Sequence, residues 1–187
     1  MRAVVARELS PEVECVELLD LTPLPDAMTR VWRQQTAEVA VRRATELQGC
    51  GRHLLLAGDP VPAAEVVAAP SAPALDAIAV CLLDATAAAQ AERLAARGDH
   101  PALLPHHQAF AEWMRGQASD PLHMMHVVSD GGWEHMRWER LERLAPEWQV
   151  HTIDTTRMTR RGVADEVLDW CRRVLAGDAP TLRVRGV

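Results

Sequence analysis

Residues 77–97 read AIAVCLLDATAAAQAERLAAR and contain the two patterns that decide the fold. The run from 77 to 83 is continuously apolar, which is typical of a strand buried on both faces of a parallel sheet. Asp84 and Thr86 follow, and Asp84 is the expected cap of an alanine-rich helix that extends to Arg97. A buried strand that leads directly into a helix is the repeating unit of α/β folds.

The same alternation continues on both sides of this stretch. Strands are expected at 13–21, 53–57 and 148–153, helices at 1–9, 27–48 and 163–175, a loop at 62–73, and short helical pieces over 102–145. The sequence therefore predicts a three-layer α/β/α fold with a mainly parallel sheet of about four strands. Residues 1–187 form a single domain in this interpretation, with a helical insert at 98–145.

Composition and charge exclude several classes of protein. The chain has 187 residues and a net charge of −6, which argues against broad nucleic-acid binding. All 20 basic residues are arginine, so no lysine-dependent chemistry is available within this sequence, and the bias indicates a GC-rich genome. The four cysteines are far apart, which argues against a structural zinc site. No signal peptide or membrane-spanning run is evident, so a cytoplasmic protein without a membrane partner is expected.

Acidic residues follow each expected strand. Because ligands of parallel sheets bind at the carboxyl ends of the strands, these carboxylates are candidate ligands for a cation, a hydroxyl group or a ribose. The alternative is helix capping, which we favour for Asp84 and leave open for Asp154. No obvious helix follows Asp59, which favours a functional role there. The four strand-end residues are Asp20, Asp59, Asp84 and Asp154.

Arginine and histidine side chains supply further candidates. Arg93 and Arg97 lie one helical turn apart, where two guanidinium groups could clamp a polyphosphate, with Arg115 in the next helix; a solvated charged face is the alternative. His123 and His126 have a spacing that could place two imidazoles near a metal, although mobile surface histidines are the simpler interpretation.

Several segments in this order resemble the P-loop kinases that act on nucleotides or small metabolites. The segment 53–59 (HLLLAGD) is similar to the Walker B-like strand of that family, and 79–98 to the strand and helix that lead into its lid. The segments 150–156 (VHTIDTT) and 164–170 (ADEVLDW) look like the closing strand, the adenine-side loop and the final helix. The resemblance extends over nearly the whole chain, and it implies that residues 98–145 form a lid.

The resemblance also implies site residues and ligands. It implies an ATP-dependent phosphotransferase that uses Mg²⁺ and a small-molecule phosphate acceptor, without a structural metal. Asp59 would hold Mg²⁺ indirectly and contribute to catalysis, together with Arg93, Arg97 and Arg115. The remaining expected contacts are Asp154, Thr155 and Thr156 toward the adenine, and Asp20 and Arg33 toward the acceptor.

One part of the family pattern is missing. The central strand and the phosphate loop with its lysine have no counterpart, and their removal would leave a gap of about 10 Å between the strands at 53–57 and 78–83. Either Met1 is an internal methionine of a longer kinase, or the neighbouring strands have closed up and phosphate binding is lost or rebuilt from arginine. The sequence as written is expected to have little or no activity.

Two other functions stay open on the sequence alone. The first is a non-catalytic binding or scaffolding protein derived from the kinase fold, with the gap filled, for example, in a homodimer. The second, less favoured, is a metal-dependent hydrolase that uses the histidines and Asp59.

Overall fold

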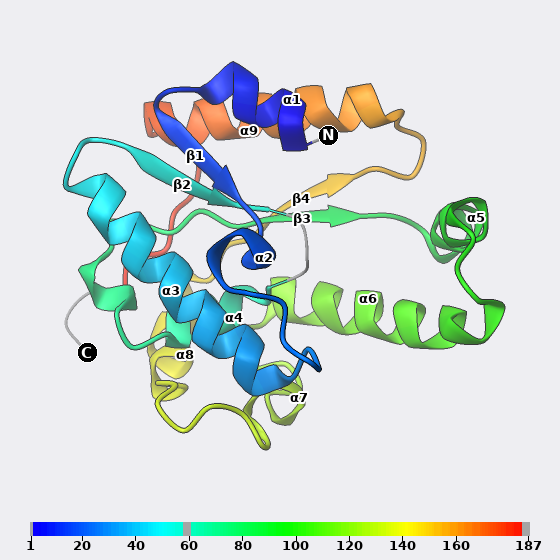
Figure 1. The fold of residues 1–187 in the computed structure, drawn as a ribbon, viewed down its shortest axis with the longest axis horizontal. Helices are drawn as coiled ribbons and strands as arrows, with labels where there is room; N and C mark the ends of the chain where they lie inside the picture. Colours follow the sequence, from blue (N-terminus) through cyan, green and yellow to red (C-terminus); the bar gives the residue numbers. More distant parts are fainter. Residues whose placement is uncertain (1, 58–60, 185–187) are drawn as a thin grey trace.

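The computed structural model describes residues 2–57 and 61–184, and Asp59 lies outside them. Helices and short parallel strands alternate along the chain (Figure 1). The main elements are α1 (Arg2–Leu9), β1 (Val13–Val16), α2 (Leu18–Leu21), α3 (Arg30–Gln48), β2 (His53–Leu56), α4 (Ala63–Ala68), β3 (Cys81–Asp84), α5 (Ala87–Arg97), α6 (Leu104–Ser119), α7 (His126–Ser129), α8 (Glu139–Leu144), β4 (His151–Asp154) and α9 (Arg160–Ala176). Single 3₁₀ turns form at Ala72–Ala74, Pro101–Leu103 and Ala145–Glu147.

The strands form two parallel pairs. β1 pairs with β2 in the register Val13 to His53, and β3 pairs with β4 in the register Cys81 to His151. No ladder joins β2 to β3 within the described residues. The parallel α/β character expected from the sequence is therefore present, but the expected sheet of about four strands is found as two separate pairs. Closure of the two neighbouring strands onto each other is not observed in this part of the chain.

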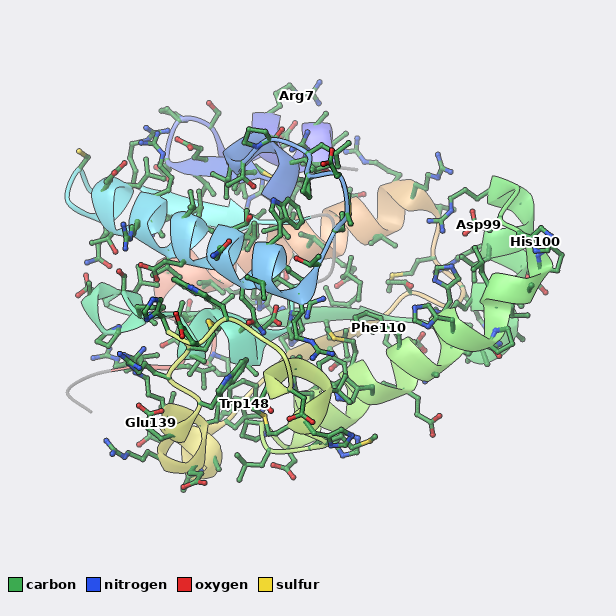
Figure 2. The ribbon with its side chains drawn as sticks, turned by 60° about the horizontal axis from the view of Figure 1, so that its bottom comes forward. Arg7, Asp99, His100, Phe110, Glu139 and Trp148 are labelled. Atoms are coloured by element: carbon green, nitrogen blue, oxygen red, sulfur yellow. The ribbon has the colours of Figure 1, made fainter. Side chains whose placement is uncertain are left out.

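Helices cover the strands on both sides. α1 and α9 pack together over one face, where their side chains share a core with Val13, Leu55 and Cys81 (Figure 1). α3, α4 and α8 lie on the other side and bury a second cluster that includes Leu141 and Trp148, and Figure 2 shows Trp148 within the body of the molecule. Each face of the strands thus supplies a separate apolar core.

Two expected segments differ from the structure. The strand expected over 13–21 ends at Val16, because α2 follows immediately and buries Leu18. The loop expected over 62–73 contains the helix α4. The prolines that suggested an irregular loop lie just outside this helix, at Pro62 and Pro70, and the alanine and valine side chains between them pack against α3.

Local signals explain where the longer helices begin and end. The hydroxyl groups of Thr29, Thr86 and Thr159 accept hydrogen bonds from first-turn N–H groups of α3, α5 and α9. α5 and α9 end at glycines with positive φ, Gly98 at 87° and Gly177 at 80°. Thr86, rather than the expected Asp84, is therefore the cap of α5, which frees the Asp84 carboxylate for another contact.

The segment 98–145 has two parts with different surroundings. α8 packs on α4 and places Leu141 in the core, whereas the start of α6 joins α5, which precedes this segment, in an arm that projects from the body (Figure 1). α5 has no buried residue, and Asp99 and His100 lie at the tip of the arm (Figure 2). None of the helices in the described residues is long and apolar enough to cross a membrane.

Candidate functional site

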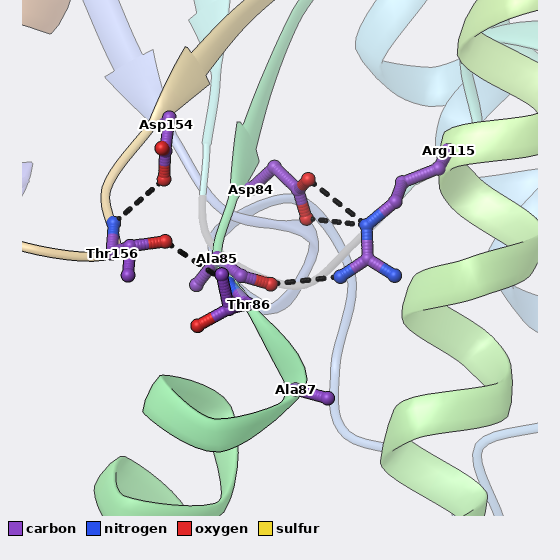
Figure 3. A pocket seen from close by; sticks show the side chains of 7 residues that line it. All are labelled: Asp84, Ala85, Thr86, Ala87, Arg115, Asp154 and Thr156. Atoms are coloured by element: carbon purple, nitrogen blue, oxygen red, sulfur yellow. Dashed lines mark hydrogen bonds and ion pairs between the residues drawn. The ribbon is translucent and has the colours of Figure 1, made fainter.

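A pocket of about 350 Å³ opens at the carboxyl ends of β3 and β4 (Figure 3). Both strands run parallel and end in the paired residues Asp84 and Asp154, and the amino end of α5 begins two residues after β3. The pocket is lined by Asp84, Ala85, Thr86, Ala87, Arg115, Asp154 and Thr156. This is the edge of a parallel sheet at which ligands generally bind.

Arg115 reaches the pocket from α6 and is oriented by β3. Its Nε donates to both carboxylate oxygens of Asp84, at 2.9 Å each, and its Nη2 donates to the carbonyl of Ala85 at 2.8 Å (Figure 3). The hydrogen bonds to Asp84 raise the pKa of Arg115 and keep it charged. Its Nη1 makes no hydrogen bond to the described residues, so one end of the fork stays available to a ligand.

Asp154 and Thr156 form the opposite wall. The N–H of Thr156 donates to the Asp154 carboxylate at 2.9 Å, and these contacts with Thr156 hold the pKa of Asp154 below its ordinary value. The hydroxyl of Thr156 in turn accepts a hydrogen bond from the N–H of Thr86 at 3.0 Å (Figure 3). The end of β4 is therefore tied directly to the start of α5.

Arg93 of α5 also connects this helix to the residues that follow β4. Its Nη1 donates to the hydroxyl of Thr155 at 2.9 Å, and its Nη2 donates to the Thr155 carbonyl. Thr155 is buried, and its own N–H and hydroxyl both donate to the carbonyl of Asp84, at 2.8 and 2.7 Å. Arg93 thus positions the wall of the pocket, and it contacts both Thr155 and, at 3.4 Å, the Thr156 carbonyl.

The structure brings together Arg93, Arg115 and the Asp154–Thr156 segment out of the residues singled out in the sequence. Arg97 lies one turn beyond Arg93 but forms an ion pair with Asp99 near the tip of the arm. It does not line the pocket. Asp99 and Leu104 line a second hollow, of about 230 Å³, between α5 and the start of α6.

The two residues expected to face a phosphate acceptor are held by other partners. Asp20 forms an ion pair with Arg2 and accepts a hydrogen bond from the N–H of Glu17. Arg33 donates both Nε and Nη2 to the carboxylate of Glu65, at 2.7 Å each, and Glu65 is completely buried. Neither Asp20 nor Arg33 lines the pocket at β3 and β4.

We find no group of three or more metal-ligating side chains within residues 2–57 and 61–184. Asp84 and Asp154 are register neighbours, but each already accepts hydrogen bonds from protein donors. They therefore suit Mg²⁺ that arrives with a ligand and keeps part of its water shell. The ring of His123 packs against Gly116, where an added Cβ would lie 2.3 Å from the ring.

Sequence reasoning missed the role of Asp84. An aspartate just before a helix was expected to be a cap, and no local pattern announces a partner 31 residues away on α6. The available signal was the second cap candidate, Thr86, only two residues later. A helix needs one cap, so the pair of candidates indicated that one of them had another task.

Comparison of the chain with protein-family models, with curated proteins and with solved structures finds no match to any of them.

Proposed function

We propose that this chain is a kinase-like protein that binds a phosphate-bearing small molecule of the ATP type in the pocket at β3 and β4. The observation that carries the proposal is the convergence of Arg115 and the amino end of α5 on one pocket, with Arg93 fixing its wall. The resemblance of the sequence to P-loop kinases points to the same class of ligand.

The charges around the pocket suit a phosphate that carries a cation. α5 presents the positive end of its dipole to the pocket, and Arg115 offers its unbonded Nη1. Asp84 and Asp154 add two negative charges at the same edge. Free phosphate would be repelled by these carboxylates, whereas the Mg²⁺ ion of a magnesium–nucleotide complex would bring a positive charge close to them.

Phosphoryl transfer by this chain is the more demanding part of the proposal. The reaction needs donors that follow the charge as it develops on the transferred group. The sequence has no lysine, so its permanently charged cationic side chains are arginines, and Arg115 is already bonded to Asp84 and Ala85. Because these hydrogen bonds already occupy Arg115, they favour a second candidate function, a binding protein derived from the kinase fold with little or no ATP turnover.

Thermal unfolding with added ligand tests the binding step. Magnesium–ATP should raise the Tm, whereas adenosine and inorganic phosphate alone should raise it less. A ligand that binds only the folded state at a hundred times its Kd stabilises it by about 2.7 kcal/mol. The variant Arg115→Gln should lose most of this shift. Arg97→Gln is the matched control, because Arg97 pairs with Asp99 away from the pocket.

A Tm that does not respond to magnesium–ATP, or an equal loss of response in both variants, would contradict binding in this pocket. Release of ADP in the presence of candidate acceptors then separates the two functions. Ligand-induced stabilisation without ADP release favours the binding protein, and acceptor-dependent release that Arg115→Gln abolishes favours the phosphotransferase.

A further inference from the structure

The inner edges of the two strand pairs are unpaired. The N–H groups of His53 and Ala57 donate to carbonyls of residues 12 and 16 at 2.9 Å, so the alternation of a parallel ladder points the N–H and C=O groups of Leu54 and Leu56 away from β1. No strand among the described residues meets them. β2 therefore presents backbone donors and acceptors on its far side.

The same reasoning applies to β3. The N–H groups of His151 and Thr155 donate to carbonyls of residues 80 and 84, at 2.9 and 2.8 Å, so even-numbered residues of β3 face β4. The N–H and C=O groups of Cys81 and Leu83 point to the opposite side, where the described part of the chain again supplies no strand. Unpaired backbone groups on two central strands are unfavourable unless something pairs with them.

These two free edges belong to one layer. Leu55 of β2 and Cys81 of β3 pack against the same helices, α1 and α9, in a single core cluster. The four strand arrows point in the same general direction (Figure 1). We call the space bounded by Leu54 and Leu56 on one side and Cys81 and Leu83 on the other the inter-pair slot.

The leucine side chains of the strands beside the slot are less buried than is usual for apolar strands of a parallel sheet. Leu54, Leu55 and Leu56 are only partly buried, and Leu83 is 39% exposed. Strands covered by helices on both faces are normally buried along their whole length, so their neighbour is missing. The four open positions carry only leucine and cysteine, so the side chains that project above and below the sheet beside the slot are uncharged.

The position of α1 indicates how an occupant would connect to the chain. Its first residue, Arg2, forms an ion pair with Glu17 at 3.2 Å, just beyond the carboxyl end of β1, and its last residue leads back to the start of β1. The amino end of α1 therefore lies at the carboxyl edge of the strands. A strand that ran through the slot parallel to β2 and β3 would end at this edge, beside the start of α1.

We propose that the inter-pair slot is the seat of one further parallel strand, an extended and uncharged apolar segment of polypeptide that leads into the amino end of α1. The slot selects a strand rather than a helix or a lipid, because the open positions alternate along β2 and β3 and require backbone donors and acceptors at the same spacing. The inference is independent of the ligand proposed above.

Amide hydrogen exchange followed by NMR tests the slot directly. In the 187-residue chain, the amides of Leu54, Leu56, Cys81 and Leu83 should exchange at least about 100-fold faster than those of Leu55 and Leu82, which donate within the ladders. Protection of the first four amides equal to that of Leu55 and Leu82 would overturn the proposal, because it would mean that these edges are already paired.

A fused strand provides the second test. An apolar segment of about five residues, joined before Met1 through a short Gly-Ser turn, should slow exchange at the four open amides and raise the Tm. The matched control carries the same extension with two prolines in the segment, which keeps it apolar but removes its donors. Protection by the first extension and not by the proline form supports a paired strand. Equal effects, or no effect of either, overturn it.

Discussion

The two strand pairs have the same parallel geometry, yet their carboxyl ends differ. Beyond β1, Glu17 and Asp20 both form ion pairs with Arg2. Beyond β3 and β4, the Asp84–Arg115 pair leaves a pocket beside it, and one nitrogen of the guanidinium faces no described partner. Aspartate and arginine thus stabilise the fold at one end and line a candidate site at the other.

The surroundings of each pair account for the difference. Next to the first pair, α3 and α4 form a closed interface in which Glu65 binds both Arg33 and the amide of Gln34. Next to the second pair, α5 has no buried residue and projects from the body, so the groups at its amino end are reachable. A ligand site needs polar groups that the fold has not already satisfied, and only the second pair offers them within the described residues.

The largest expected effect lies beside the first pair. Replacing Glu65 by alanine should lower the free energy of unfolding by about 3 kcal/mol, because Arg33 loses its acceptor and the buried Gln34 amide keeps only the Val128 carbonyl. Urea unfolding measures the loss. The control Glu46→Ala removes an exposed pair with Arg43 and should cost less than about 1 kcal/mol. Similar losses for both variants would remove the distinction between buried and surface pairs.

A smaller effect on stability is expected at Arg93, with an added effect on the ligand. Arg93→Gln should cost about 1–2 kcal/mol, since three hydrogen bonds to Thr155 and Thr156 are lost. It should also weaken the stabilisation by magnesium–ATP, whereas Arg97→Gln should not. Thermal unfolding of both variants, with and without ligand, measures the two effects. A full ligand response in Arg93→Gln would show that the wall of the pocket does not depend on this arginine.

The Asp154 carboxylate should produce a weaker, pH-dependent effect. Thr156 lowers its pKa in the folded state, so its contribution to stability is present above the ordinary aspartate pKa, near 3.9, and is lost as the pH falls through the lower folded value. Asp154→Asn should therefore lower the Tm at pH 6, and its difference from the unmodified chain should shrink toward pH 3. A difference that stayed constant over this range would contradict the assigned pKa direction.

The smallest effect is expected at Asp20. Asp20→Asn removes an exposed ion pair with Arg2, so it should change stability little and leave the response to magnesium–ATP intact. Calorimetric titration with magnesium–ATP provides the measurement. Loss of nucleotide binding in this variant would place the ligand at the first strand pair and would reverse the comparison.

Local patterns predicted much of the secondary structure. The apolar runs at 53–57 and 77–83 predicted β2 and β3, and the helix ends at Gly98 and after Gln48 agree with glycine signals in the sequence. The strand expected over 13–21 was right only as far as Val16, because Leu18 is buried in α2. The loop expected over 62–73 was wrong, because burial of Val67 in α4 outweighed the flanking prolines. Propensity decides only where packing is weak.

The candidate site was predicted in part, for a similar reason. Arg93 and Arg115 could be named from the one-turn spacing of Arg93 and Arg97 and from the kinase resemblance, and Asp154 because it follows an expected strand. The partner of Arg115 could not, since Asp84 lies in a distant element and its contact depends on how α6 crosses β3. The same limit explains Arg33, whose buried acceptor Glu65 was hidden in a segment expected to be a loop.

The sequence by itself determined the alternation of strands and helices, because apolar periodicity, threonine caps and glycine ends act over a few residues. It also determined that the chain has no lysine, so that its permanently charged cationic side chains are arginines. Only the tertiary structure decided which arginines form ion pairs within the protein, as Arg33 does with Glu65. It also decided that no strand of the described residues pairs with the inner edges of β2 and β3. Both outcomes depend on contacts between residues far apart in the chain, which no local pattern encodes.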